Sequence, residues 1–159
     1  MTAPSDSPPP RRRGPRLDTD AAYTSPFTIV GRIRSFRHAA KGMAFVLRSQ
    51  HNAWLHAVAT VLALVLAAVL HVTVEPALTV GEWADLVIAI VLVWVSETFN
   101  TGLEVLADGM VAERHPIVKI GKDVAAAAVL LSALGAVVVG AILFIPRLMI
   151  LVEQLLAAR

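Results

Sequence analysis

Three long apolar segments constrain this chain more than any other feature of its sequence. They cover residues 52–72, 83–107 and 124–146. Each is close to the roughly 20 residues that an α-helix needs to cross the hydrocarbon core of a bilayer. Of the whole chain, 57% is hydrophobic and only 16% is charged, which is more apolar than an ordinary soluble domain. We therefore expect an all-α membrane protein with three transmembrane helices.

The segments that flank the spans have different characters. Apolar residues recur at spacings of three and four in residues 27–48, with Arg and Lys between them, which predicts a basic amphipathic helix on an anionic membrane face. Residues 1–26 have no long apolar run, so we predict a disordered cytoplasmic tail. Residues 147–159 are amphipathic but too short to span, and are predicted to form a short interfacial extension.

The distribution of positive charge predicts the orientation. The connection at residues 73–82 has no Lys or Arg, whereas the connection at 108–123 and the chain before the first span are basic. By the positive-inside rule, the N-terminus and the second connection face the cytoplasm of a multi-pass inner-membrane protein. The basic N-terminal region is better explained by anionic lipid than by nucleic acid, because no aromatic residue interleaves the arginines before Tyr23.

Carboxylates interrupt the second apolar segment. At 100° per residue, Glu97, Thr101, Glu104 and Asp108 fall within about 60° of one another, with Asn100 beside them. Charged groups at this depth cost several kcal/mol unless they are paired or solvated. One face of this helix is therefore acidic, and its presence indicates a functional site.

Polar residues after the acidic face complete the groups that phosphoryl transfer requires. Glu113, His115, Lys122 and Asp123 follow within the second connection. Carboxylates hold Mg²⁺, lysine binds phosphate, and a base accepts the proton of an attacking hydroxyl. The chain has no cysteine, which excludes thiolate chemistry and cysteine metal sites. Residue types alone leave open a proton relay or ion pathway, or a structural Lys122–Asp123 pair.

The order and spacing of these residues resemble the prokaryotic diacylglycerol kinase and undecaprenol kinase family. The resemblance covers about residues 32–146. It rests on ETFNTGLE from Glu97 to Glu104, Asp108, Glu113-Arg-His115, GKDVAAAA from Gly121, RSFRHAAKG from Arg34 and QHNAWLH from Gln50. The resemblance implies a homotrimer of three-span subunits, each with a surface helix, which uses ATP and Mg²⁺.

The resemblance also assigns roles to individual residues. It implies that Glu97 is the catalytic base facing the lipid hydroxyl, that Glu104 binds the metal bridging the nucleotide phosphates, and that Asn100 orients the site. The positions that it assigns to nucleotide contacts are His38, Glu113, His115, Lys122 and Asp123. Among the tryptophans, Trp54 is the best candidate to touch lipid, because it lies near the start of the first span.

Two residues depart from the family pattern. Gln50 stands where many members have a second metal-binding glutamate, and His38 stands where some have a nucleotide-contacting tyrosine. An amide oxygen can ligate Mg²⁺ but carries no charge, so Gln50 puts the ligand set in doubt. We expect the other histidines near the first span, His51, His56 and His71, to lie at interfaces or to hydrogen-bond a neighbouring helix rather than to ligate metal.

The sequence thus predicts an ATP-dependent lipid kinase at the cytoplasmic face of the inner membrane. Its acceptor would be diacylglycerol or undecaprenol, and its mechanism direct in-line transfer without a phosphoenzyme. The sequence does not decide between the two lipids, because ordinary apolar residues line the spans. The alternative is a non-catalytic membrane protein, either a proton or ion pathway or an assembly factor whose acidic face pairs with a partner.

Overall fold

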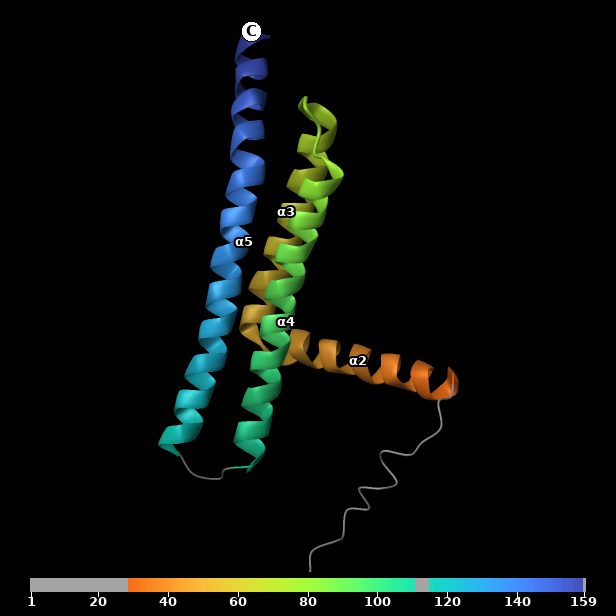
Figure 1. Ribbon diagram of the computed structural model, residues 1–159, viewed down its shortest axis with the longest axis vertical. Helices are drawn as coiled ribbons and strands as arrows, with labels where there is room; N and C mark the ends of the chain where they lie inside the picture. Colours follow the sequence, from red (N-terminus) through yellow and green to blue (C-terminus); the bar gives the residue numbers. More distant parts are fainter. Residues whose placement is uncertain (1–28, 111–114, 159) are drawn as a thin grey trace, which may run out of the picture. The chain divides into compact units, whose positions relative to one another are not determined.

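The computed structural model describes residues 29–110 and 115–158, and nearly all of them are helical (Figure 1). The helices are α2 (Ile29–Ser49), α3 (His51–Thr73), α4 (Val80–Met110) and α5 (Pro116–Ala157). The last three are long and apolar enough to cross a membrane. These findings confirm the predicted all-α membrane fold with three spans. The predicted tail at residues 1–26 lies outside the described residues.

The chain divides into two compact units, Met1–His38 and Ala39–Arg159. In the first unit, the described residues form the beginning of α2, and the side chains of residues 32–38 are exposed there. The helical conformation agrees with the predicted helix, and its position at a membrane surface stays a prediction. The second unit contains the rest of α2 and the three long helices.

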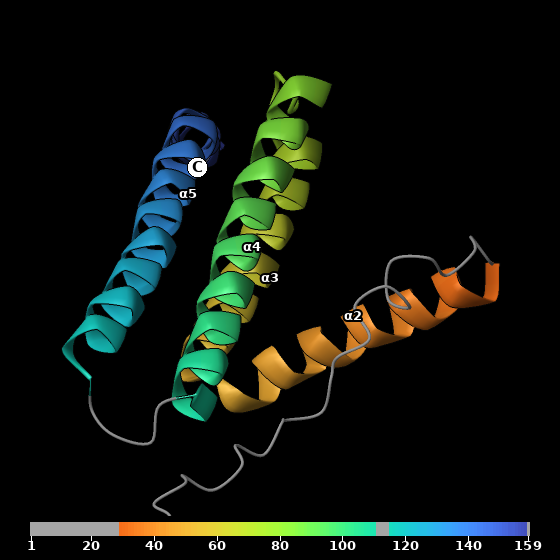
Figure 2. The same ribbon diagram turned by 60° about the horizontal axis from the view of Figure 1, so that its bottom comes forward.

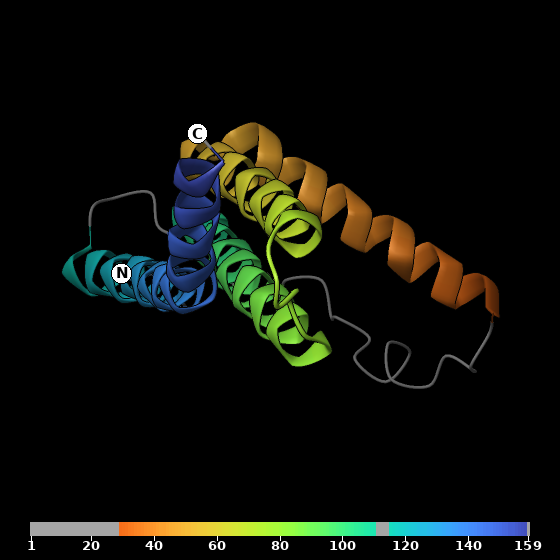
Figure 3. The ribbon, with the colours of Figure 1, turned by 90° about the horizontal axis from the view of Figure 1, so that it is seen from above.

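The helix α4 is the most enclosed of the three long helices. One third of its most apolar stretch (33%) is buried, against 11% for α3 and α5. All three pairs of these helices are in contact, α4 with α5 most extensively. Figures 2 and 3 show the three helices in two further views. Most large apolar side chains of α3 and α5 face outward, as expected where the surroundings are lipid or other subunits. The acidic segment of the sequence is therefore on the most enclosed helix.

The apolar core lies near the connection between α3 and α4. Its buried members are Ala67, Leu70, Val74, Leu78, Leu86, Leu143 and Phe144. At this end α4 begins with a capping box: Thr79 N donates to Glu82 Oε2 at 2.8 Å, and Glu82 N donates to Thr79 Oγ1 at 3.2 Å. These bonds satisfy backbone groups that the first turn of a helix leaves free.

The helix α5 does not end at Pro146. It continues to Ala157, over 42 residues or about 63 Å at 1.5 Å per residue. We expected a separate short segment after Pro146, because proline lacks a backbone N–H and disfavours the helix interior. The structure accommodates this proline within one continuous helix, as membrane helices commonly do. Whether residues 147–159 lie at an interface stays a prediction.

Arg147, the residue after this proline, fastens α5 to the α3–α4 connection. Its side chain is 8% exposed. Its Nη1 and Nη2 donate to the two carboxylate oxygens of Glu82, both at 2.9 Å. The guanidinium also donates to the carbonyl oxygens of Pro76, Ala77 and Leu143. The planar guanidinium of arginine suits such a bidentate pair. These bonds attach α5 to the α3–α4 connection directly after Pro146.

Candidate active site

The carboxylate of Glu97 is buried in the middle of α4. Its residue is 1% exposed, and neither carboxylate oxygen has a hydrogen-bond partner among the described residues. Its nearest ion-pairing group is His56 on α3, whose Nε2 lies 3.7 Å from Glu97 Oε2. Burial of an unpaired carboxylate is costly, and such groups in native proteins call for an explanation. A group that binds or reacts at this point is one such explanation.

Glu104, two turns further along α4, is held by two amides. Gln50 Nε2 donates to Glu104 Oε2 at 3.1 Å, and Asn100 Nδ2 donates to Glu104 Oε1 at 3.2 Å. Gln50 is the residue between α2 and α3, at the N-cap position of α3, and its side chain makes no capping hydrogen bond there. Three residues that the sequence assigned to one site therefore meet in the structure, although Gln50 and Glu104 are far apart in sequence.

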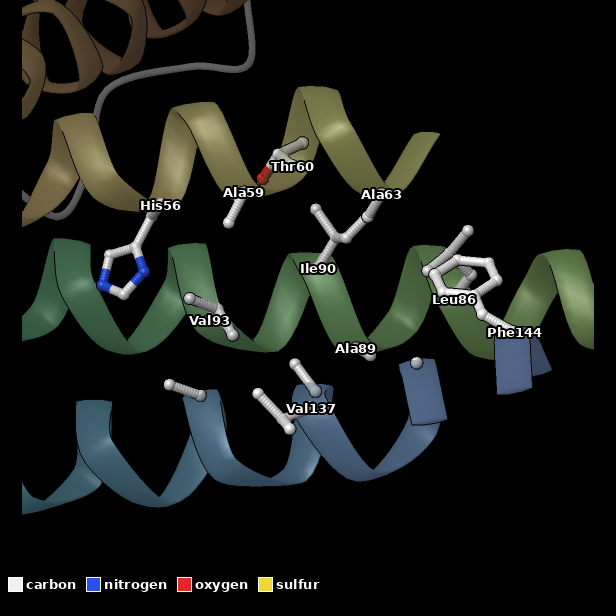
Figure 4. A pocket seen from close by; sticks show the side chains of 13 residues that line it. His56, Ala59, Thr60, Ala63, Leu86, Ala89, Ile90, Val93, Val137 and Phe144 are labelled. Carbon is white, nitrogen blue, oxygen red and sulfur yellow. The ribbon is translucent and has the colours of Figure 1, made fainter. Parts of the chain in front are cut away.

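Two mainly apolar cavities lie beside His56, and Glu97 lines one of them. One, of about 230 Å³, is lined by Glu97 and Asn100 together with Asn52, Leu55, His56, Ala126, Val129, Leu130 and Ala133. The second, of about 280 Å³, extends from His56 to Phe144 between α3, α4 and α5 (Figure 4). His56 and Ala133 line both. Glu97 thus lines a mainly apolar cavity.

The basic residues at the start of α5 form two ion pairs. Lys122 Nζ donates to Asp108 Oδ1 at the end of the acidic face of α4, and Lys119 Nζ donates to Asp123 Oδ2 at 2.7 Å. His115 caps α5, because its Nδ1 accepts a hydrogen bond from the backbone N–H of Ile117 at 3.3 Å. Lys122 therefore lies beside the acidic face as expected, whereas Asp123 pairs within its own helix.

Comparison with known proteins assigns the chain to the family that the sequence motifs resemble. Residues 37–144 match the model of the family described as prokaryotic diacylglycerol kinase. The chain belongs to this family. The predicted family resemblance is therefore confirmed, and Gln50, Glu97, Asn100, Glu104 and Lys122 all lie within the matched region.

Two curated relatives illustrate the range of the family. Over 116 residues the chain is 38% identical to a protein named diacylglycerol kinase from Synechocystis sp., covering 72% of this chain and 63% of that protein. Over 115 residues it is 30% identical to a protein named undecaprenol kinase from Bacillus subtilis, covering 72% of this chain and 89% of that protein. The chain thus spans less than two thirds of the length of the Synechocystis relative.

Three predicted contact residues stay predictions. Glu113 lies outside the described residues. His38 is exposed and belongs to the first unit, so its predicted nucleotide contact is untested. Trp54 is 62% exposed on α3, which is compatible with contact to lipid but does not demonstrate it.

The oxygen donors near Glu104 suit a magnesium ion only in part. Within residues 29–110 and 115–158, no three His, Asp or Glu side chains gather closely enough to enclose a metal ion. Mg²⁺ in nucleotide sites is commonly bound by one or two carboxylates, with phosphates and water completing the octahedron. The Glu104 carboxylate and the Gln50 amide oxygen fit this pattern, with Gln50 as a neutral ligand.

His56 is the residue whose position the sequence did not reveal. We expected it to contact a neighbouring helix, as His71 does by accepting a 3.5 Å hydrogen bond from Trp83 Nε1. His56 likewise meets the neighbouring helix α4, as expected, and the sequence did not reveal that the residue it meets there is Glu97. One available signal was that Asn52 and His56 are four residues apart in an otherwise apolar helix, and both line the Glu97 cavity.

Proposed function

We propose that this chain transfers the γ-phosphoryl group of ATP to the hydroxyl group of a membrane lipid. The observation that carries the proposal is the Glu97 carboxylate, which is buried, free of hydrogen-bond donors among the described residues and exposed to an apolar cavity. Membership of the prokaryotic diacylglycerol kinase family and the names of both relatives support it.

Each residue of the site has a chemical task in this reaction. The lipid oxygen attacks the γ-phosphorus in line with the bond to the β–γ bridging oxygen, which breaks to release ADP. Glu97 accepts the proton of the lipid hydroxyl as the new O–P bond forms. Lys122 offsets negative charge on the phosphoryl oxygens after it leaves Asp108. The amide of Asn100 keeps Glu104 in a fixed orientation.

Mg²⁺ bound by Glu104 and the amide oxygen of Gln50 would neutralise charge on the nucleotide phosphates. Glu97 and Glu104 are separated by about 10.5 Å of helical rise. This spacing separates the proton acceptor from the metal ligand along one helix face. The lipid hydroxyl and the nucleotide can therefore approach the same face from different sides.

The location and assembly of the protein follow from the same argument. We propose that the site faces the cytoplasm at the inner membrane. The chain before the first span and the connection at residues 108–123 are both basic, and basic connections face the cytoplasm. We also propose a homotrimer, because one chain supplies a single acidic helix and the family resemblance implies three subunits. The partners are lipid and membrane, and no nucleic acid is involved.

The test of this proposal is transfer of labelled phosphate from ATP to diacylglycerol and to undecaprenol, side by side. Purified protein in mixed micelles should phosphorylate at least one lipid, and the reaction should require Mg²⁺. The relatives are named for both activities, so the preferred lipid is read from the ratio of the two rates. No transfer to either lipid by an intact oligomer would refute the proposal, and nucleotide-independent proton transport in sealed vesicles would favour the pathway alternative.

A further inference from the structure

His56 and Glu97 form a buried pair across α3 and α4 that has no part in the roles given above. The two groups are 3.7 Å apart, and their side chains are 16% and 1% exposed. His56 Nε2 and both carboxylate oxygens lack a hydrogen-bond partner among the described residues. Two unsatisfied groups of complementary chemistry therefore face each other in an apolar surrounding.

Glu97 needs a donor that fixes its carboxylate. Among the ion pairs of the described residues, its partner is His56. The distance of 3.7 Å exceeds the roughly 3.2 Å upper range of an N–H···O bond, and a small side-chain rotation would close it. Without such a donor, no side chain among the described residues fixes the orientation of this carboxylate.

The imidazole ring of His56 is itself held in place. Trp94 on α4 meets it edge to face, with ring centroids 6.5 Å apart and an interplanar angle of 69°. Trp94 Nε1 donates a 3.1 Å hydrogen bond to Thr60 Oγ1, one helical turn after His56 on α3. Figure 4 shows His56 and Thr60 projecting from the same helix at the edge of the cavity. Trp94 thus ties the two helices together at the point where His56 meets Glu97.

We propose that His56 is a positioning residue for Glu97. Its Nε2–H donates a hydrogen bond to Glu97 Oε2, which leaves Oε1 available to the lipid hydroxyl. The proton released by the hydroxyl passes to Oε1, and His56 keeps its own proton throughout. This inference rests on the proposed function, since it concerns the base of the same reaction.

The kinetic test compares two histidines of the same helix. His71 also meets a tryptophan edge to face, Trp83, with centroids 5.9 Å apart, and it lies fifteen residues from His56. His56→Phe should lower kcat by at least about tenfold, the loss expected for one hydrogen bond to a charged group, and leave KM for ATP nearly unchanged. His71→Phe should leave both constants nearly unchanged. Equal kcat for parent and His56→Phe would overturn the proposal.

Chemical rescue separates positioning from packing. His56→Ala opens space beside a cavity of about 280 Å³, so added imidazole should restore part of the lost kcat. Added thiazole, a ring of similar size that has no N–H to donate, should restore none. Equal rescue by both compounds, or by neither when His56→Phe has lost activity, would show that His56 acts through packing alone. Circular dichroism and oligomer size establish that each variant is folded.

A spectroscopic test does not depend on kinase activity. In protein with ¹⁵N-labelled histidine, the ring resonances of His56 are those that His56→Phe removes. They should shift in Glu97→Gln and stay in place in Glu104→Gln, whereas the His71 resonances stay in place in both. If the parent phosphorylates no lipid, the proposed function fails. The shift of the His56 resonances then still tests whether His56 and Glu97 are hydrogen-bonded. If the parent is active and the His56 resonances do not respond to Glu97→Gln, the positioning role of His56 is overturned and the proposed function stands.

Discussion

Gln50 donates a 3.1 Å hydrogen bond from its Nε2 to Glu104 Oε2, across 54 positions of the sequence. At this position many family members have a glutamate, which would place two like charges side by side unless a cation lay between them. The amide removes that repulsion, and Glu104 accepts hydrogen bonds from Gln50 and Asn100. To act as a ligand, Gln50 must turn its amide oxygen toward the ion.

The first prediction concerns Gln50→Glu. A second carboxylate restores a charged ligand, and the charge of the ligand set governs affinity for divalent cations. We expect the Mg²⁺ concentration for half-maximal transfer to fall on the order of tenfold. His51→Glu is the matched control, because it adds the same charge at the next position on an exposed side chain. An unchanged Mg²⁺ requirement in Gln50→Glu would remove residue 50 from the metal site.

The second prediction concerns Glu97→Gln. The amide has nearly the same shape but cannot accept the hydroxyl proton, so kcat should fall by about 10²- to 10⁴-fold, the usual contribution of a general base. KM for ATP and the helical content should stay near the parent values. Glu104→Gln is the comparison: it should raise the Mg²⁺ requirement as well as lower the rate. Parent-like turnover in Glu97→Gln would exclude Glu97 as the base.

The helices and the acidic face could be predicted from sequence because local rules determine them. Span length locates α3 and α4 to within a few residues, and the helical period places Asn100 and Glu104 on one face. The contact between Gln50 and Glu104 needed the family resemblance as well, because no local rule joins residues so far apart.

The partner of Glu97 could not be predicted in this way. The helix α3 is apolar almost all round, so its sequence does not specify which face turns toward α4. The rotation that brings His56 to Glu97 is set by packing, including the Trp94–Thr60 hydrogen bond. The continuation of α5 past Pro146 was missed for a related reason, because the stabilising contacts of Arg147 come from the distant Glu82 and the α3–α4 connection.

The third prediction concerns Arg147, which follows the last residue of the family match, 144. Arg147→Met removes the bidentate partner of Glu82 and leaves that carboxylate unpaired. Removing one partner of a buried ion pair typically costs about 3 kcal/mol or more. Because the Glu82 side chain is 27% exposed, we expect a smaller loss, measured as a lower onset temperature of thermal unfolding in detergent. The double variant Arg147→Met with Glu82→Gln should recover part of the loss, because the unpaired charge is gone.

The control for this prediction is Arg48→Met, since Arg48 is exposed at the end of α2. It should leave the unfolding temperature nearly unchanged. A parent-like unfolding temperature for Arg147→Met would mean that the contacts of Arg147 do not stabilise the bundle.

The fourth prediction separates two lysines of α5. Lys122 pairs with Asp108 on α4, whereas Lys119 pairs with Asp123 within α5 and is 78% exposed. If Lys122 binds phosphate, Lys122→Met should raise KM for ATP by about tenfold, the value of one charge-assisted hydrogen bond. Lys119→Met should change it by no more than about twofold, since exposed pairs contribute little.

Asp108→Asn then distinguishes phosphate binding from helix pairing. Both Lys122→Met and Asp108→Asn break the same ion pair, but only the first removes the cation. A phosphate-binding Lys122 is freed by Asp108→Asn, so KM for ATP should stay at the parent value or fall. If Asp108→Asn instead raises KM as much as Lys122→Met does, the pair serves to hold α4 against α5, and the cation that binds the nucleotide must be sought elsewhere in the chain.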